Sequence, residues 1–259
     1  MKLLTTFRLT AVLGLMFIAS AAIAAGGDKY VEEAEIDPGN INSLQRGAAN
    51  FMNYCSGCHS AKYVRFNTIG DHLELSEAML VDNLMFNAEK TFEPIRSSMD
   101  SDDSSRWFGA SPPDLSLIAR SKGADYIYTF LKTYYVDPSS PTGVNNVAKG
   151  LNAMPHVLWE LQGFQKAVYE TQITEKEDDE GNIEIVETEV FVGFEQVTAG
   201  SMDAEDFEDF VRDTVNFLAF IGEPNRADRR RIGTWVIIYL LVFLIIASML
   251  KKQIWKDVD

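Results

Sequence analysis

The sequence Cys55-Ser56-Gly57-Cys58-His59 decides how this chain of 259 residues is organised. It contains both cysteines of the chain, and a histidine directly follows the second one. The C-x-x-C-H pattern is typical of the attachment site of a c-type haem. Two thiols at this spacing can form thioethers with the two vinyl groups of one porphyrin, and the adjacent His59 can then bind the iron as proximal ligand. The motif therefore predicts one covalently attached haem c.

Three other kinds of site share part of this motif. A thioredoxin-like redox pair shares the C-x-x-C spacing, but no β-strand pattern precedes Cys55 and a histidine follows Cys58. A structural zinc site would need two further ligands, and His72 and His156 are the only other histidines. A plain disulfide would leave His59 without a role. Haem attachment is favoured, and a non-haem thiol-redox or metal-binding module is the alternative.

A low-spin electron carrier needs a second axial ligand for its iron, and methionine is preferred where the reduction potential is high. Outside the two chain ends, the side chains that could serve are Met52, Met79, Met85, Met99, Met154, Met202, His72 and His156. Met52 is too close to the cysteines to reach the far face of the haem. Met154 lies in an irregular segment, where Pro155 would stiffen a loop that projects the sulfur. The sequence favours Met154 and leaves the others open.

Periodicity around the motif predicts a mainly helical domain. Apolar residues at helical spacing predict helical segments at 42–55, 76–86, 114–135 and 203–221. Asp125 and Asp203 are the expected N-caps within the last two segments. Residues 97–113 are rich in Ser, Asp and Pro, and residues 137–155 in Pro, Gly and Asn, so both are expected to be irregular.

The region 165–198 has a different pattern. Thr, Val, Ile and Glu alternate over residues 168–198, on both sides of the acidic segment 175–182. Alternation with a Gly-Asn turn predicts a β-hairpin with a strongly acidic tip.

The two ends of the chain predict its compartment. A basic start, an apolar run and small residues near Ala24 are typical of a signal peptide. Ile232 to Leu250 carry no charge, and 19 helical residues rise about 28 Å, enough to cross a hydrocarbon core of about 30 Å. Basic residues flank both ends of this span, so its orientation rests on the signal peptide. The expected order is signal peptide 1–24, exported haem domain 25–225, transmembrane anchor 232–250 and cytoplasmic tail 251–259.

Charge excludes one class of function. The chain carries 38 acidic and 23 basic side chains, a formal charge of −15. A polyanionic backbone would be repelled by such a surface, which argues against nucleic-acid binding. The acidic residues concentrate in the exported domain, where they either keep the surface soluble or steer a basic partner.

Several further stretches occur in a fixed order around the motif. They are Arg46-Gly47, Ser60 to Val64, Pro112 to Ser116, Gly123 to Tyr126, Ala153-Met154-Pro155, and Glu223-Pro224 before a run of arginines. With this ordered set and a C-terminal anchor, the chain resembles the cytochrome c1 family over most of residues 42–255. Members of that family are the haem-bearing subunits of quinol–cytochrome c oxidoreductase, the bc1 complex.

The resemblance implies a mainly α, cytochrome c-like haem domain with a β-hairpin elaboration and one C-terminal transmembrane helix. It implies that Met154 is the sixth iron ligand opposite His59. Arg120 and Tyr126 match positions that contact a haem propionate, and Pro112 matches a proline packed beside the proximal histidine. The hairpin region 165–198 is longer than in mitochondrial relatives, so the reach of its tip is not implied.

The resemblance also implies partners. The chain would be an electron carrier rather than an enzyme by itself, taking electrons from the Rieske iron–sulfur protein. It would pass them to a soluble or membrane-attached cytochrome c, beside a cytochrome b subunit. The expected place is the bacterial inner membrane, with the haem domain in the periplasm. The alternative is a c-type cytochrome subunit of another terminal oxidase or reductase.

Overall fold

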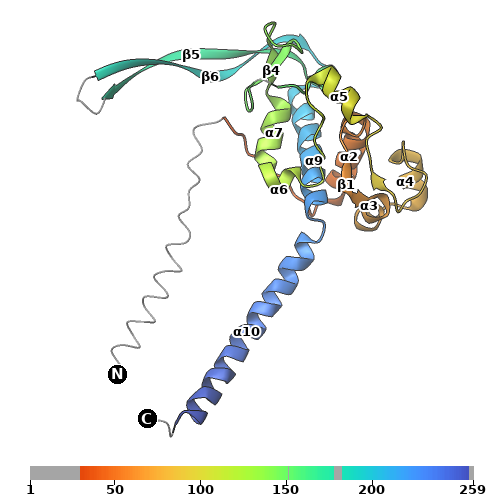
Figure 1. The fold of residues 1–259 in the computed structure, drawn as a ribbon, viewed down its shortest axis with the longest axis vertical. Helices are drawn as coiled ribbons and strands as arrows, with labels where there is room; N and C mark the ends of the chain where they lie inside the picture. Colours follow the sequence, from red (N-terminus) through yellow and green to blue (C-terminus); the bar gives the residue numbers. More distant parts are fainter. Residues whose placement is uncertain (1–29, 151, 178–182, 257–259) are drawn as a thin grey trace.

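The computed structural model describes residues 30–150, 152–177 and 183–256. This part of the chain forms a helical body, a long two-stranded ribbon and a long separate helix (Figure 1). The ribbon and the separate helix leave the body in different directions. The predicted mainly α architecture with a hairpin elaboration is confirmed. The predicted signal peptide, residues 1–24, lies outside the described residues.

Two helices cross in the body. Helix α2 (Ile41–Asn50) continues into a π-helical turn, η1 (Phe51–Cys55), and α9 (Ala204–Gly222) packs against α2. A Cβ on Gly47 would lie 2.0 Å from the carbonyl oxygen of Asp213 in α9, so the close approach requires glycine. Arg46 donates to the same Asp213, with Nε 2.5 Å from Oδ2. The crossing therefore fixes the end of α2, and with it the cysteine motif, against α9.

Shorter helices surround this pair: α3 (Phe66–Leu73), α4 (Glu77–Asn83), α5 (Ser101–Phe108), α6 (Ile118–Lys122), α7 (Ala124–Lys132) and α8 (Trp159–Gln162). Helix α5 shows that the prediction of an irregular segment over 97–113 is wrong in part. Asp100 caps it, because its Oδ1 accepts hydrogen bonds from the amides of Asp102 and Asp103. Gly109 ends it in the left-handed conformation, with φ of 77°.

The two expected N-caps have different outcomes. Asp203 caps α9, since its Oδ1 accepts from the amide of Asp206 at 2.9 Å. Asp125 is not a cap, because α7 begins after Gly123. Its carboxylate instead accepts from the backbone amide of Ala34 at 2.9 Å. Asp125 therefore holds the extended segment before α2 against α7.

The strands form three antiparallel pairs in the described residues. β1 (Ala61–Arg65) pairs with β2 (Pro94–Ile95), and β3 (Tyr134–Val136) pairs with β4 (Val144–Asn146). The third pair is the predicted hairpin, β5 (Gly163–Glu177) with β6 (Ile183–Ala199). Within 137–155, which was expected to be irregular throughout, β4 is the exception.

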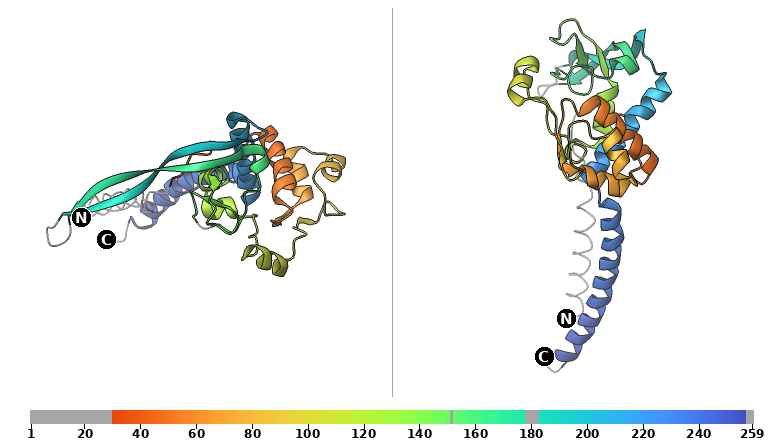
Figure 2. Two further views of the ribbon diagram at one scale, coloured as in Figure 1. Left: turned by 90° about the horizontal axis from the view of Figure 1, so that it is seen from above. Right: turned by 90° about the vertical axis from the view of Figure 1, so that its right-hand side faces the viewer.

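Among the described residues, the ribbon of β5 and β6 contacts the body over the part nearest its base. Gln165 donates through Nε2 to the carbonyl oxygens of Lys132 and Tyr134, at 3.0 and 2.8 Å. Farther out, the ring of Tyr30 meets that of Phe191 edge-on at 4.9 Å. Beyond this point the ribbon extends away from the body (Figure 1 and the left view of Figure 2). Of the predicted acidic tip, residues 175–182, the first three belong to the end of β5, and residues 178–182 lie outside the described residues.

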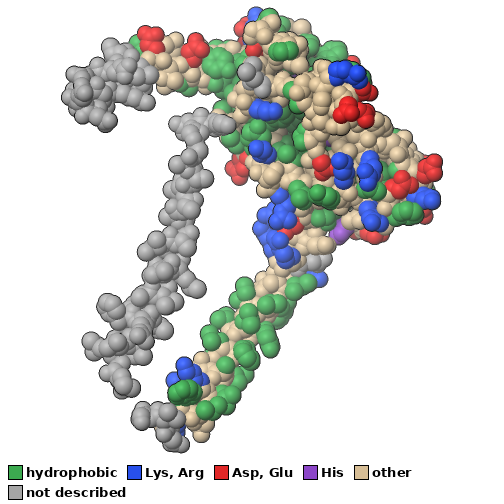
Figure 3. All heavy atoms as spheres, viewed as in Figure 1, with side chains coloured by type: hydrophobic (Ala, Val, Ile, Leu, Met, Phe, Trp, Pro, Cys, Tyr) green, Lys and Arg blue, Asp and Glu red, His purple; other side chains and the backbone are tan. Residues whose placement is uncertain are grey.

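Helix α10 (Arg226–Ile254) contains the predicted anchor. Its segment Arg229–Ile254 is long and apolar enough to cross a membrane, and none of its most apolar stretch is buried in the described chain. Apolar side chains cover the helix between basic groups at its two ends (Figure 3). An exposed apolar helix of this length is costly in water, so the structure supports a membrane anchor.

Candidate haem-binding site

A cavity of about 390 Å³ lies beside the cysteine motif. Its lining is predominantly apolar and includes six of the seven predicted site residues, Cys55, Cys58, His59, Pro112, Tyr126 and Met154. These residues come from segments up to 99 positions apart in the chain, and the fold brings them together. The seventh, Arg120, is not among the lining residues. Its stem lies against Gly222 at the end of α9 instead.

The motif forms a tight turn after η1. The amides of Cys58 and His59 both donate to the carbonyl oxygen of Cys55, at 3.1 and 2.8 Å. Two serines hold the turn, because Ser56 Oγ donates to the carbonyl of Met52 and Ser97 Oγ to that of Gly57, both at 2.7 Å. This backbone arrangement presents both sulfur atoms and the imidazole to the same cavity.

The imidazole of His59 has the tautomer and orientation of a metal ligand. Its Nδ1 lies 2.8 Å from the carbonyl oxygen of Pro113, which can only accept, so Nδ1 carries the proton. The lone pair is then on Nε2, which makes this nitrogen the available ligand atom. Burial lowers the pKa of His59, although the hydrogen bond to Pro113 and the charge of Asp114 oppose the shift. The imidazole is therefore neutral at pH 7 and fixed in orientation.

The two cysteines are not joined by a disulfide. Burial raises the pKa of the Cys55 thiol to about 12, with a smaller effect from Cys58, and burial also raises the pKa of Cys58. Two thiols, a neutral imidazole and a thioether around an apolar cavity are the donor set that a covalently attached haem requires. The residues therefore fit haem c.

The other proposed second ligands lie elsewhere. Among the described residues, Met154 is the one methionine that lines the cavity. Met52 and Met85 are buried in the core, and Met79 is 48% exposed. His72 meets the ring of Phe220 at 5.5 Å, and His156 stacks on Tyr134 at 4.9 Å.

Two features of the site were missed from the sequence. Lys122 and Lys149 line the cavity, and none of the described lining residues is acidic. Both lysines are exposed, which places cations at the rim, where they suit the anionic propionates of a haem. The folded chain brings them together from α6 and from the loop after β4, and no local pattern marks either one.

The described residues do not support a structural metal site built from His, Cys, Asp or Glu side chains. Within the described ranges, no group of three or more His, Cys, Asp or Glu side chains is arranged to hold a metal ion. The structural-zinc interpretation of the motif would need such a group.

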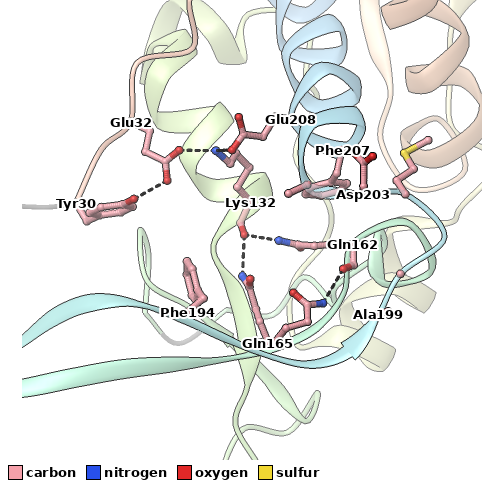
Figure 4. Close-up of a pocket in the computed structure, with 14 residues that line it drawn as sticks. Tyr30, Glu32, Lys132, Gln162, Gln165, Phe194, Ala199, Asp203, Phe207 and Glu208 are labelled. Atoms are coloured by element: carbon pink, nitrogen blue, oxygen red, sulfur yellow. Dashed lines mark hydrogen bonds and ion pairs between the residues drawn. The ribbon is translucent and has the colours of Figure 1, made fainter.

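A second cavity, of about 550 Å³, lies at the base of the ribbon (Figure 4). Lys132 Nζ lies 2.5 Å from Glu32 and 2.9 Å from Glu208, and the Tyr30 hydroxyl donates to Glu32 at 2.6 Å. Burial would lower the pKa of Lys132, but hydrogen bonds to Glu208 and Glu32 outweigh it and raise the pKa. The cluster joins the segment before α2 to α7 and α9, so we assign it to holding that segment in place.

Comparison with known proteins gives three informative relatives and one family. The family model described as "Cytochrome C1 family" matches residues 35–258. The chain is 42% identical to cytochrome c1 of Allochromatium vinosum over 244 residues, 94% of this chain and 96% of the relative. It is 36% identical to the ammonia monooxygenase gamma subunit of Nitrosomonas europaea, over 97% of each chain. Identity to the mitochondrial cytochrome c1 heme protein of Neurospora crassa is 25%, over 87% of this chain and 65% of the relative.

The family match and the cavity agree with each other. The matched range contains the C-x-x-C-H turn, Met154 and the apolar helix α10. The chain therefore belongs to the cytochrome c1 family, whose members bind one covalent haem c.

Proposed function

We propose that this protein is the haem-bearing electron carrier of a bc1 complex. It accepts one electron from the Rieske iron–sulfur protein and passes it to a soluble or membrane-attached cytochrome c. The observation that carries the proposal is the single cavity that brings together Cys55, Cys58, His59 and Met154. When bound, haem c supplies reversible one-electron transfer at its iron.

The side chains of the site hold and tune the cofactor. Cys55 and Cys58 would attach it covalently, and His59 and Met154 would bind its iron. The Pro113 carbonyl fixes the orientation of His59, and a hydrogen bond at this nitrogen increases the basicity of the ligand. The apolar lining, which includes Pro112 and Tyr126, excludes water from the porphyrin. No side chain makes or breaks a substrate bond, so the protein is a carrier rather than an enzyme by itself.

Arg120 stays a proposed propionate contact. Its stem lies against Gly222, outside the cavity lining. Lys122 and Lys149, at the rim of the cavity, are the better-placed cations. All three side chains are positively charged, and a charge-assisted hydrogen bond to a carboxylate is the interaction expected of them.

The proposed setting is the bacterial inner membrane, with residues 25–225 in the periplasm and residues 251–259 in the cytoplasm. The anchor α10 and the membership of a bc1 subunit family support a cytochrome b subunit as neighbour in the membrane. The acidic exported surface supports a basic electron acceptor, because complementary charge accelerates encounter.

Protease accessibility tests the topology. Protease added outside spheroplasts is expected to degrade the haem domain and to spare an epitope placed after Asp259. The physical reason is that the bilayer shields the tail while the exported domain is in contact with the medium. Loss of the epitope with survival of the haem domain would reverse the proposed orientation.

Purification from the membrane tests the function. The chain, tagged and solubilised in mild detergent, is expected to co-purify with a cytochrome b and a Rieske protein. Added quinol should then reduce its haem, followed by absorbance. If the chain instead co-purifies with the subunits of a terminal oxidase, or of a monooxygenase such as the one named for the Nitrosomonas relative, it works in a different complex.

A further inference from the structure

Two buried polar side chains hold the main chain of Met154. Asn152 Nδ2 donates to the Met154 carbonyl oxygen at 3.0 Å and to the Tyr134 hydroxyl at 2.6 Å. The Tyr134 hydroxyl donates to the same Met154 carbonyl at 3.2 Å. Asn152 Oδ1 accepts from the Met154 amide at 3.4 Å. One asparagine thus contacts both the amide and the carbonyl of Met154, and a tyrosine closes the network.

The network is anchored in a rigid part of the fold. Asn152 is 6% exposed and Tyr134 is 2% exposed, so both work away from bulk water. Tyr134 lies in β3, which pairs with β4, and its ring stacks on His156 with centroids 4.9 Å apart. Its own carbonyl accepts from Gln165 at the base of the ribbon. The Met154 loop is therefore tied to a packed strand through two side chains.

We propose that Asn152 and Tyr134 are positioning residues that keep the sulfur of Met154 at the haem iron. The inference rests on the proposed role of Met154 as axial ligand. A thioether is a neutral and weak ligand, so its residence at the iron depends on how firmly its backbone is held. Without the two donors, the loop gains freedom and a larger fraction of the oxidised protein has the sulfur away from the iron.

Imidazole binding to the oxidised holoprotein measures that fraction directly. Imidazole takes the axial position only when the sulfur has left, so its apparent affinity rises in proportion to the open fraction. Asn152→Leu and Tyr134→Phe each remove hydrogen bonds at nearly constant volume. Losing hydrogen bonds of ordinary strength is expected to tighten imidazole binding about tenfold in each variant. The absorption band of methionine-ligated ferric haem should weaken in parallel.

Matched controls separate positioning from general stability. Asn146 is also buried, at 1% exposed against 6% for Asn152, and its side chain bonds Phe130, Thr133 and Ala148 rather than Met154. Asn146→Leu should lower the midpoint of unfolding by denaturant and leave imidazole affinity unchanged. Tyr135→Phe, next to Tyr134 in the same strand, should also leave it unchanged. If Asn146→Leu tightens imidazole as much as Asn152→Leu does, the effect is general loosening and the inference is wrong.

A third variant separates failure of this inference from failure of the ligand assignment. Met154→Ala should bind imidazole far more tightly than the parent protein, and Asn152→Leu should add nothing in that background. If Met154→Ala tightens imidazole binding but Asn152→Leu and Tyr134→Phe alone do not, the positioning role is refuted and the ligand assignment stands. If Met154→Ala leaves the affinity unchanged, Met154 is not the ligand and both fail.

Discussion

Replacing Met154 by histidine is expected to lower the reduction potential of the haem by about 0.2 V or more, with the covalent haem retained. A nitrogen donor in place of the neutral thioether stabilises Fe(III) over Fe(II), which is the direction of the shift. For a one-electron couple, about 59 mV corresponds to a tenfold change in the equilibrium constant. The shift therefore changes the equilibrium by more than about a thousandfold, and reduction by a high-potential iron–sulfur donor should stall.

A redox titration followed by absorbance measures this potential, and two methionines provide controls. Met79 is 48% exposed in α4, and Met99 lies in the segment before α5; neither lines the cavity. Met79→His and Met99→His should leave the potential nearly unchanged. A lowered potential in either control, together with an unchanged value in Met154→His, would show that Met154 has been assigned wrongly.

The double variant Cys55→Ser, Cys58→Ser is expected to carry no covalent haem. The chain has no other cysteine, so no thiol is left to form a thioether. A cavity of about 390 Å³ with an apolar lining is then left unfilled, and the body should lose much of its stability because cavities of this kind are costly. Haem staining after denaturing electrophoresis tests attachment, since only covalent haem remains with the polypeptide.

An immunoblot of the same gel provides the control for the double variant. It shows whether the polypeptide is present where the haem stain is absent. A stained band at the position of the double variant would contradict attachment through these thiols. The single variants should retain a stained band of reduced intensity, because one thioether is still available in each.

Local signals explain what the sequence predicted correctly. The C-x-x-C-H motif, the uncharged run at 232–250, the alternating hairpin and the Asp203 cap each depend on residues close together in the chain. Helix α5 also has a local signal, with Asp100 as N-cap and Gly109 as C-cap. The Ser and Asp content of 97–113 nevertheless favours a loop, and it masks the helix signal at these two positions.

Contacts between distant residues explain what the sequence could not predict. Asp125 is of a residue type that favours N-cap positions and lies near the start of α7. Its carboxylate nevertheless accepts a hydrogen bond from the amide of Ala34, 91 residues away. Lys122 and Lys149 become neighbours of the motif only when α6 and the loop after β4 fold around it. The placement of Arg120 away from the cavity depends in the same way on its packing against Gly222.

Helix α9 joins the wall of the cavity to the anchor, with a consequence for the distance over which electrons travel. Thr214 and Leu218 of α9 line the cavity, and Leu218 lies four residues, or about 6 Å of helix, before the end of α9 at Gly222. Three residues then lead into α10, and Arg229 forms an ion pair with Glu223 across this joint. This short connection ties the wall of the cavity to the membrane anchor, so a haem in the cavity would be held close to the lipid surface. A partner that delivers electrons from the membrane therefore has to reach a centre whose distance from the lipid surface is limited by three residues of chain.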